Sequence, residues 1–145
     1  MASTRLKKEK LLSHGLLALG ILTAILATRL AYSEEKSPPA LTIEEAVIAP
    51  GVENLTPVKP ALSFDSTVGK LYCFTRIKSD RPPAFIKHLW FQGDKMVMEV
   101  TLPVKSTSWR TYSTKTILPS ASGDWKVDVT SEDGTVLKTL NFRIR

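Results

Sequence analysis

The chain has 145 residues, one cysteine, and 20 Lys and Arg against 14 Asp and Glu, which gives a net charge of +6. Five of the basic residues and one acidic residue lie in the first 33, so the rest of the chain carries 15 against 13. A net charge of +2 over that length does not favour nucleic-acid binding, and a single cysteine excludes an internal disulfide.

The first 33 residues are typical of a bacterial export signal. A basic segment, Arg5 to Lys10, precedes an uncharged run from Leu11 to Thr28, and Ala31-Tyr32-Ser33 supplies a small-x-small cleavage site. The uncharged run has 18 residues, near the lower limit for a membrane-spanning helix, so two alternatives stay open. Residues 1–33 are either a cleaved signal peptide or a hydrophobic anchor helix that holds the chain in the membrane through residues 11–31. Both alternatives place the remainder in the periplasm or on the periplasmic face of the inner membrane.

A polar linker at residues 34–41 contains Pro38 and Pro39 and leads into one domain at residues 42–145. Apolar runs separated by turn residues predict strands at 42–49, 69–78, 84–92, 95–104, 108–118, 124–130 and 135–145. Residues 52–67 are expected to cross irregularly, with an edge strand within 55–64. No long run of period 3.6 follows Leu30, so we expect an all-β fold, an immunoglobulin-like two-sheet β-sandwich.

A two-residue turn at Gly93-Asp94 predicts a hairpin register. The register places one apolar face in the core, which consists of Phe85, Leu89, Phe91, Met96, Met98, Val100 and Leu102. The opposite face then carries His88 and Trp90, with His88 directly opposite Glu99. On the last two strands, the residues expected in the core are Trp125, Val127, Val129, Val136, Leu140, Phe142 and Ile144.

Several sequence blocks in order resemble an uncharacterised bacterial family, domain of unknown function 2914. They are Gly69-Lys-Leu-Tyr-Cys-Phe-Thr75, His88-Leu-Trp-Phe91, Ser108-Trp-Arg-Thr-Tyr-Ser113, Gly123-Asp-Trp-Lys-Val127 and Asp133-Gly134. The resemblance runs from about Ala46 to the C-terminus. It implies a short exported or membrane-attached protein and carries no activity, substrate or cofactor.

A binding surface is the first candidate site. Alternation along residues 108–118 places Arg110 and Tyr112 on one face, and Trp109 on the other. Arginine and aromatic side chains dominate binding hot spots, so Trp109, Arg110 and Tyr112 are candidate ligand-binding residues. The face of the predicted hairpin that lies opposite its apolar core face adds three further candidates, His88, Trp90 and Glu99. The alternative for Trp109 and Arg110 is structural, as a core plug and as a partner of strand-end carbonyls or of Asp128.

A thiol or metal site is the second candidate. If residues 69–78 and 84–92 form a hairpin, Cys73 lies opposite His88 and one strand from Glu99, which would activate the thiol or hold a metal. If that loop crosses between the sheets, the two residues separate and Cys73 is a buried core residue. No Gly-x-Ser-x-Gly motif accompanies the candidate serines, Ser106, Ser108 and Ser113, so a serine hydrolase is not favoured.

The sequence therefore predicts a non-catalytic module, exported or membrane-anchored, that binds an envelope protein or a glycan. No cofactor, metal or nucleic acid is expected. A thiol- or metal-dependent site at Cys73, His88 and Glu99 is the alternative.

Overall fold

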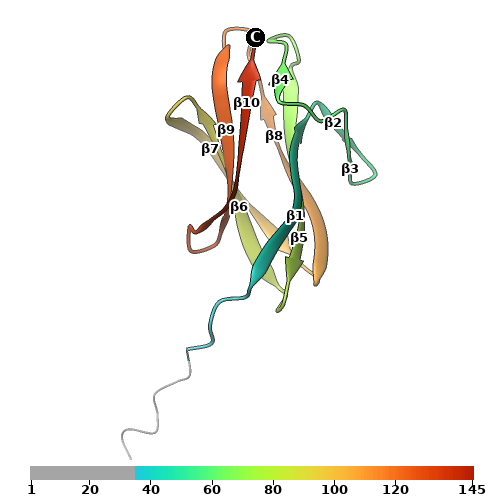
Figure 1. The fold of residues 1–145 in the computed structure, drawn as a ribbon, viewed down its shortest axis with the longest axis vertical. Helices are drawn as coiled ribbons and strands as arrows, with labels where there is room; N and C mark the ends of the chain where they lie inside the picture. The colour runs from blue at the N-terminus through green and yellow to red at the C-terminus, as the bar shows by residue number, and fades with distance from the viewer. Residues whose placement is uncertain (1–34) are drawn as a thin grey trace, which may run out of the picture. The chain divides into compact units, whose positions relative to one another are not determined.

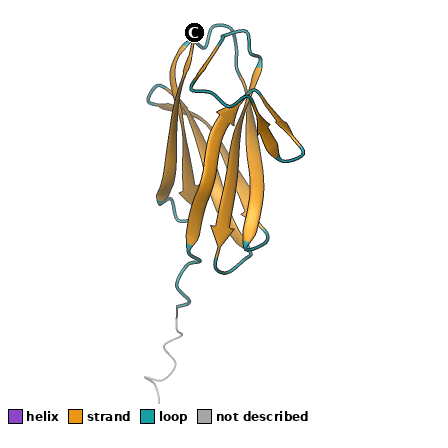
Figure 2. Ribbon diagram, turned by 45° about the vertical axis from the view of Figure 1, so that its right-hand side comes forward, coloured by secondary structure: helices purple, strands orange, loops and turns teal. Residues whose placement is uncertain are grey.

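A computed structural model describes residues 35–145, and these residues form ten strands and no helix (Figure 1, Figure 2). The strands are β1 (Leu41–Ala49), β2 (Gly51–Glu53), β3 (Thr56–Val58), β4 (Ser63–Phe64), β5 (Lys70–Ser79), β6 (Ala84–Gln92), β7 (Lys95–Val104), β8 (Ser108–Thr116), β9 (Gly123–Ser131) and β10 (Val136–Ile144). The all-β prediction is confirmed, and each expected strand is present within two residues of its predicted ends.

Two larger sheets face each other in a sandwich-like arrangement (Figure 2). One has three strands in the order β1-β5-β8, and the other has five in the order β4-β10-β9-β6-β7. Along the seven long strands the chain crosses between these sheets after β5, after β7 and after β8, and the short β4 joins the five-stranded sheet between β1 and β5. The buried apolar residues of both sheets form one cluster, so a single core holds the sandwich together.

Strand alternation explains which side chains fill this core. Leu71, Cys73 and Ile77 of β5 point inward and are fully buried, and Trp125 and Val127 of β9 are buried as expected. On β10, Phe142 and Ile144 are also buried as predicted. The prediction for Val136 is wrong, because this residue begins β10 beside a register shift and is 54% exposed.

The predicted hairpin register is correct only at the turn. Phe91 pairs with Met96, but a β-bulge between Trp90 and Phe91 shifts every earlier pair by one residue. Leu89 therefore lies opposite Glu99, Phe85 lies opposite Pro103, and His88 lies opposite Val100.

The predicted core face of the hairpin is therefore wrong on β6, whereas on β7 Met98 and Leu102 pack partly buried against the core as predicted. Ile86, His88 and Trp90 are fully buried, whereas Phe85 and Met96 are 41% and 51% exposed. Successive side chains of a strand point to opposite faces. A register error of one residue on β6 therefore exchanges all of its predicted core and surface residues.

The irregular segment predicted at residues 52–67 contains three short strands. β2 and β3 form a hairpin whose turn residues, Asn54 and Leu55, both have positive φ, as in a type I′ turn. β4 pairs in parallel with the end of β10. The expected edge strand within 55–64 is thus two short pieces, β3 and β4, rather than one strand.

The expected linker ends in contact with the domain. Residues 35–40 have no regular secondary structure, and β1 begins at Leu41. The β5–β6 loop fixes this segment, since Ala40 N–H donates to Asp80 Oδ1 (2.7 Å) and Arg81 donates to the Pro38 carbonyl (2.7 Å). No membrane-spanning helix occurs among residues 35–145, and the expected signal or anchor at residues 1–33 lies outside the described residues.

Candidate functional site

A chain of polar side chains crosses the core between the two sheets. His88 of β6 lies between two hydroxyls of the three-stranded sheet, Thr75 Oγ1 at 3.0 Å from Nε2 and Ser113 Oγ at 2.7 Å from Nδ1. Trp90 Nε1–H donates to the same Ser113 Oγ at 3.0 Å, and Thr75 also hydrogen-bonds the Cys73 thiol. Cys73, Thr75, His88 and Trp90 are fully buried and Ser113 is 5% exposed.

One direction of hydrogen bonding satisfies this whole cluster when His88 is neutral. Trp90 donates to Ser113, Ser113 donates to Nδ1 of His88, Nε2–H donates to Thr75, and Thr75 donates to the Cys73 sulfur. A protonated imidazole would donate from both nitrogens and leave the Ser113 hydroxyl hydrogen without an acceptor. Burial lowers the pKa of His88 to about 4, so the neutral form persists in the folded domain.

Cys73 and His88 are not cross-strand neighbours. β5 and β6 lie in different sheets, so the hairpin that would pair them does not exist. Burial raises the pKa of the Cys73 thiol far above its ordinary value, which opposes formation of the nucleophilic thiolate. Glu99 lies beside Leu89 and forms an ion pair with Lys87 (3.7 Å).

No group of three or more His, Cys, Asp or Glu residues among residues 35–145 is arranged to hold a metal ion. The predicted line of Cys73, His88 and Glu99 across three neighbouring strands does not form, because β5 lies in a different sheet from β6 and β7. His88 and Trp90 also leave the candidate binding surface, because neither side chain reaches solvent.

The exposed candidates lie on β8, at the edge of the three-stranded sheet. Arg110 and Tyr112 face away from the core, and Tyr112 is 40% exposed. The Tyr112 ring contacts that of Tyr72 on β5, with ring centroids 5.6 Å apart. Trp109 points the other way and packs partly buried against the core, which agrees with its structural alternative.

Arg110 lies directly opposite Arg76 of β5. Like charges in opposed cross-strand positions are unfavourable. At Arg76 the repulsion is offset by Glu44 and Glu45, whose carboxylates lie 3.6 Å and 3.9 Å from its Nε. Arg110 is exposed and takes part in none of the ion pairs found within residues 35–145. We call Tyr72, Arg76, Arg110 and Tyr112 the β5–β8 face.

Sequence reasoning found half of this face. It identified Arg110 and Tyr112 but missed Tyr72 and Arg76, whose side chains lie on the same face of the sheet on the neighbouring strand β5. Alternation along residues 69–78 already places both away from Cys73, so the missing information was that β5 and β8 are neighbours. Thr75 and Ser113 were missed as partners of His88 for the same reason.

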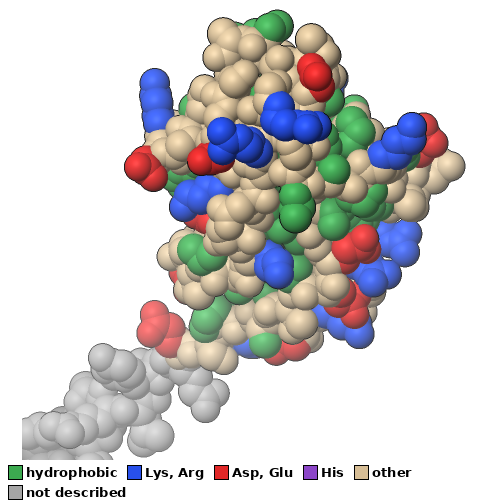
Figure 3. Space-filling view, turned by 45° about the horizontal axis from the view of Figure 1, so that its top comes forward, with side chains coloured by type: hydrophobic (Ala, Val, Ile, Leu, Met, Phe, Trp, Pro, Cys, Tyr) green, Lys and Arg blue, Asp and Glu red, His purple; other side chains and the backbone are tan. Residues whose placement is uncertain are grey.

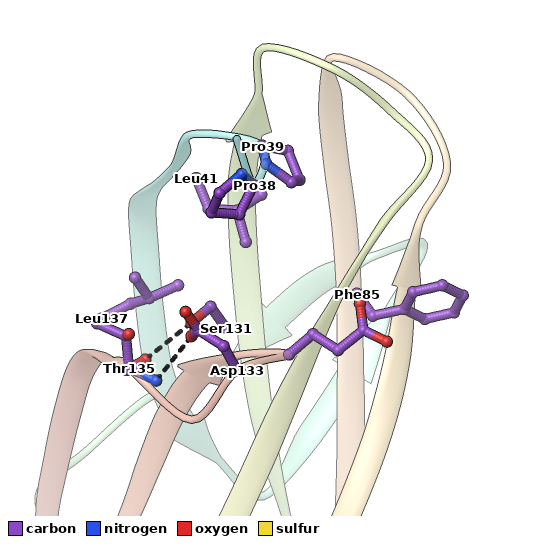
Figure 4. Close-up of a pocket in the computed structure, with 9 residues that line it drawn as sticks. Pro38, Pro39, Leu41, Phe85, Ser131, Asp133, Thr135 and Leu137 are labelled. Atoms are coloured by element: carbon purple, nitrogen blue, oxygen red, sulfur yellow. Dashed lines mark hydrogen bonds between the residues drawn. The ribbon is translucent and has the colours of Figure 1, made fainter. Parts of the chain in front are cut away.

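A pocket of about 450 Å³ lies between the N-terminal segment and the β9–β10 turn (Figure 4). Its apolar wall consists of Pro38, Pro39, Leu41 and Leu137, and the β9–β10 turn forms the rest. In that turn the Asp133 carboxylate accepts hydrogen bonds from Ser131 and Thr135, which lower its pKa. The Phe85 ring points away from the other lining side chains (Figure 4). Among the polar groups of the lining, those of Ser131, Asp133 and Thr135 bond one another (Figure 4).

Charge is not gathered into one field on the face drawn in Figure 3. Basic and acidic side chains are interspersed there with apolar ones, and no histidine is visible (Figure 3). The ion pair of Lys78 with Glu44 (2.9 Å) illustrates such local neutralisation, and it lowers the pKa of the Glu44 carboxyl.

Comparison with known proteins gives one family match, which covers part of the chain. No curated protein matches this chain in sequence. One family model matches residues 83–144, which contain β6 to β10. The sequence blocks between residues 46 and 82 that resemble the same family lie outside this range. Within residues 83–144 the resemblance is confirmed: this part of the chain matches the family described as Protein of unknown function (DUF2914).

Proposed function

We propose that this chain is a non-catalytic binding module, exported or membrane-anchored, which binds an envelope protein or a glycan through the β5–β8 face. One observation carries the proposal. Arg110 is exposed, lies opposite another arginine and forms no ion pair with a carboxylate of residues 35–145, and it lies on the same face as the Tyr72–Tyr112 ring pair. An arginine beside exposed aromatic rings suits recognition of a ligand that is anionic and has a flat or apolar part.

The proposed location is the periplasm or the periplasmic face of the inner membrane. Its support is the order of the first 33 residues, in which a basic segment, an apolar run and a small-x-small motif follow one another. The domain itself begins at Pro38, so a cleavage after Ser33 would leave it whole.

We also propose that the sandwich is of immunoglobulin-like type. The support is its strand order, since the first, second and fifth long strands form one sheet and the third, fourth, sixth and seventh form the other. A buried tryptophan on the third long strand, Trp90 of β6, is a hallmark of that fold. Cys73 of β5 is the chain's only cysteine, so the inter-sheet disulfide of antibody domains is absent.

Site-specific photocrosslinking in cells tests the binding surface. A photoreactive phenylalanine at Thr114, on the β5–β8 side, is expected to give a discrete crosslinked product, and the same group at Asn141 of β10 is not. Arg110→Ala and Tyr112→Ala are expected to reduce the Thr114 product at least fivefold, with Lys138→Ala as the matched control. Digestion of the product by protease or by glycan-cleaving enzymes identifies the partner's class. Equal products from both positions, or products unaffected by the two substitutions, would reject the β5–β8 face.

A further inference from the structure

β8 has one hydrogen-bonded neighbour, β5, and its other side is a free sheet edge within the described residues. Two backbone hydrogen bonds flank the paired residues of β5 and β8. Ser79 N–H donates to the Thr107 carbonyl (3.0 Å), and Ile117 N–H donates to the Gly69 carbonyl (2.9 Å). In antiparallel pairs the direction of these groups alternates along the strand. Odd-numbered residues of β8 therefore bond β5, and the N–H and carbonyl groups of the even-numbered ones point outward. The outward set includes Arg110, Tyr112 and Thr114.

Proteins usually protect such edges with bulges, prolines or inward charges. The two other long edge strands have these devices. β1 has a register shift between Ile43 and Glu45, and β7 has the bulge beside Trp90 and contains Pro103. β8 has no bulge and no proline, since its nine pairs with β5 run without a shift; its one charge on the core-facing side, Lys115, lies near the end of the strand. It is a regular strand that is ready to accept another.

The charge of β8 selects what it can accept. The strand contains Arg110 and Lys115 and no acidic residue. Pairing of two β8 strands from two copies would bring four positive charges together, which opposes self-association. A segment with carboxylates at alternate positions would place them near Arg110, on the face that also presents Tyr112.

We propose that β8 binds an extended, acidic segment of a partner protein as an added antiparallel or parallel strand. The backbone groups of Arg110, Tyr112 and Thr114 supply the hydrogen bonds, and the side chains of Arg110 and Tyr112 select the sequence. This inference rests on the proposed function, because it names the partner class and the binding mode of the same surface.

Amide exchange and chemical-shift mapping by NMR test the binding mode on residues 35–145. The probe is a nine-residue capped peptide in which glutamate alternates with threonine and valine, and its lysine counterpart is the control. We expect the amides of Arg110, Tyr112 and Thr114 to exchange fast in the free protein and at least tenfold more slowly with the acidic peptide. Thr111 and Ser113 already donate to β5 and should change little. Equal effects of both peptides, or no slowing at the three outward amides, would overturn the proposal.

Two further outcomes would contradict the proposed peptide partner and identify another occupant of β8. An acidic oligosaccharide, oligogalacturonate, is titrated in parallel. If it shifts the β5–β8 face and the peptide does not, the ligand is a glycan and strand addition is wrong. If the outward amides slow with increasing protein concentration alone, the occupant is a second copy of this chain.

A proline scan separates strand addition from binding to the face. Thr114→Pro removes one outward N–H from a position where an edge strand tolerates proline, and Thr114→Ala keeps it. We expect the peptide Kd to rise at least tenfold for Thr114→Pro and less than twofold for Thr114→Ala. If Arg110→Ala abolishes the crosslink from Thr114 in cells while Thr114→Pro leaves the peptide Kd unchanged, the proposed function stands and strand addition fails. Should Thr114→Pro not fold, the exchange data on the unaltered protein decide.

Discussion

At the scale of single residues, the polar chain through His88 determines how the core responds to its surroundings. Hydrogen-bonded polar groups cost little when buried, but the same groups become expensive when one partner is lost. The sequence drew attention to His88 because it is the only histidine after residue 14. What the sequence could not reveal is that Thr75 and Ser113 supply both of its partners, since they come from the opposite sheet.

The buried imidazole predicts acid sensitivity. Burial lowers the pKa of His88 to about 4, below the ordinary value of 6.5, so the unfolded chain binds this proton more readily than the folded domain. The stabilisation is therefore complete above pH 6.5 and is lost as the pH falls towards 4. Between pH 7 and pH 5 the free energy of unfolding should decrease by about 2 kcal/mol from this group alone.

Urea denaturation at the two pH values measures this decrease. His88→Gln is the matched control, because glutamine keeps hydrogen-bonding capacity without titrating. The exposed carboxyls whose pKa is lowered, such as Asp65, titrate below this range. If the variant loses as much stability between pH 7 and pH 5 as the unaltered protein, His88 is not the group responsible.

The Ser113 hydroxyl hydrogen-bonds two buried nitrogen atoms, so its removal should lower the free energy of unfolding. Ser113→Ala leaves Nδ1 of His88 and Nε1 of Trp90 without a partner in the core. We expect the free energy of unfolding to fall by about 2 to 5 kcal/mol, since each orphaned buried group costs roughly 1 to 3 kcal/mol. Thr116→Ala, at an exposed position on the same strand, is the control and should change stability by less than about 0.5 kcal/mol. A loss no larger than that of the control would mean that water replaces the hydroxyl.

At the scale of elements, the strands were predictable and one register was not. Turn residues such as Gly93-Asp94 and Asp133-Gly134 delimit the strands, and their apolar alternation is visible in the sequence. The β6–β7 bulge is not encoded by a glycine or proline at Trp90 or Phe91. The bulge adds one extra residue on β7, Val97, between the partners of Trp90 and Phe91, so counting outward from the turn gave the wrong face of β6. The large exposed residue Phe85 was misplaced for this reason.

The clamp between the N-terminal segment and the β5–β6 loop gives a prediction at this scale. Asp80 accepts from Ala40 N–H through its carboxylate and donates its own N–H to the Ala40 carbonyl (3.2 Å). Asp80→Ala removes the first bond and should free residues 38–40 without unfolding the sheets. We expect faster amide exchange and proteolysis confined to residues 35–41, with the Tm lowered by less than about 5 °C, because an exposed hydrogen bond contributes about 1 kcal/mol.

Asp94→Ala, in the β6–β7 turn, serves as the comparison and should leave residues 35–41 unaffected. Exchange that accelerates throughout β1 as well would show that the clamp holds the strand and not only the segment before it.

At the scale of the whole molecule, the order of strands within the sheets was beyond the sequence. Local patterns report which residues are buried but not which distant strand buries them. The crossings between the long strands are made by short loops, such as residues 105–107, whose sequences do not say which sheet the next strand joins. Placing β5 and β6 in different sheets removed the Cys73–His88–Glu99 site, and placing β5 beside β8 created the face of Tyr72, Arg76, Arg110 and Tyr112.

Export of the chain is a prediction at this scale. An alkaline phosphatase domain fused after Arg145 is expected to be active in a bacterial host, because that enzyme needs an oxidising compartment to form its disulfides. Intact-mass measurement then separates the two alternatives for residues 1–33: a chain that starts at Glu34 was cleaved, and a full-length chain in the membrane fraction is anchored. A fusion that is stable but inactive would place the domain in the cytoplasm and contradict the export signal.

The burial of Cys73 has a practical consequence for studying this protein. Because the only thiol of the chain is enclosed and held protonated, an electrophile such as a maleimide should leave the folded domain unmodified. Any cysteine introduced at the surface then becomes the single labelling site, with no need to replace the native one. Fluorophores or spin labels can thus be attached one at a time along β8, with the core left intact.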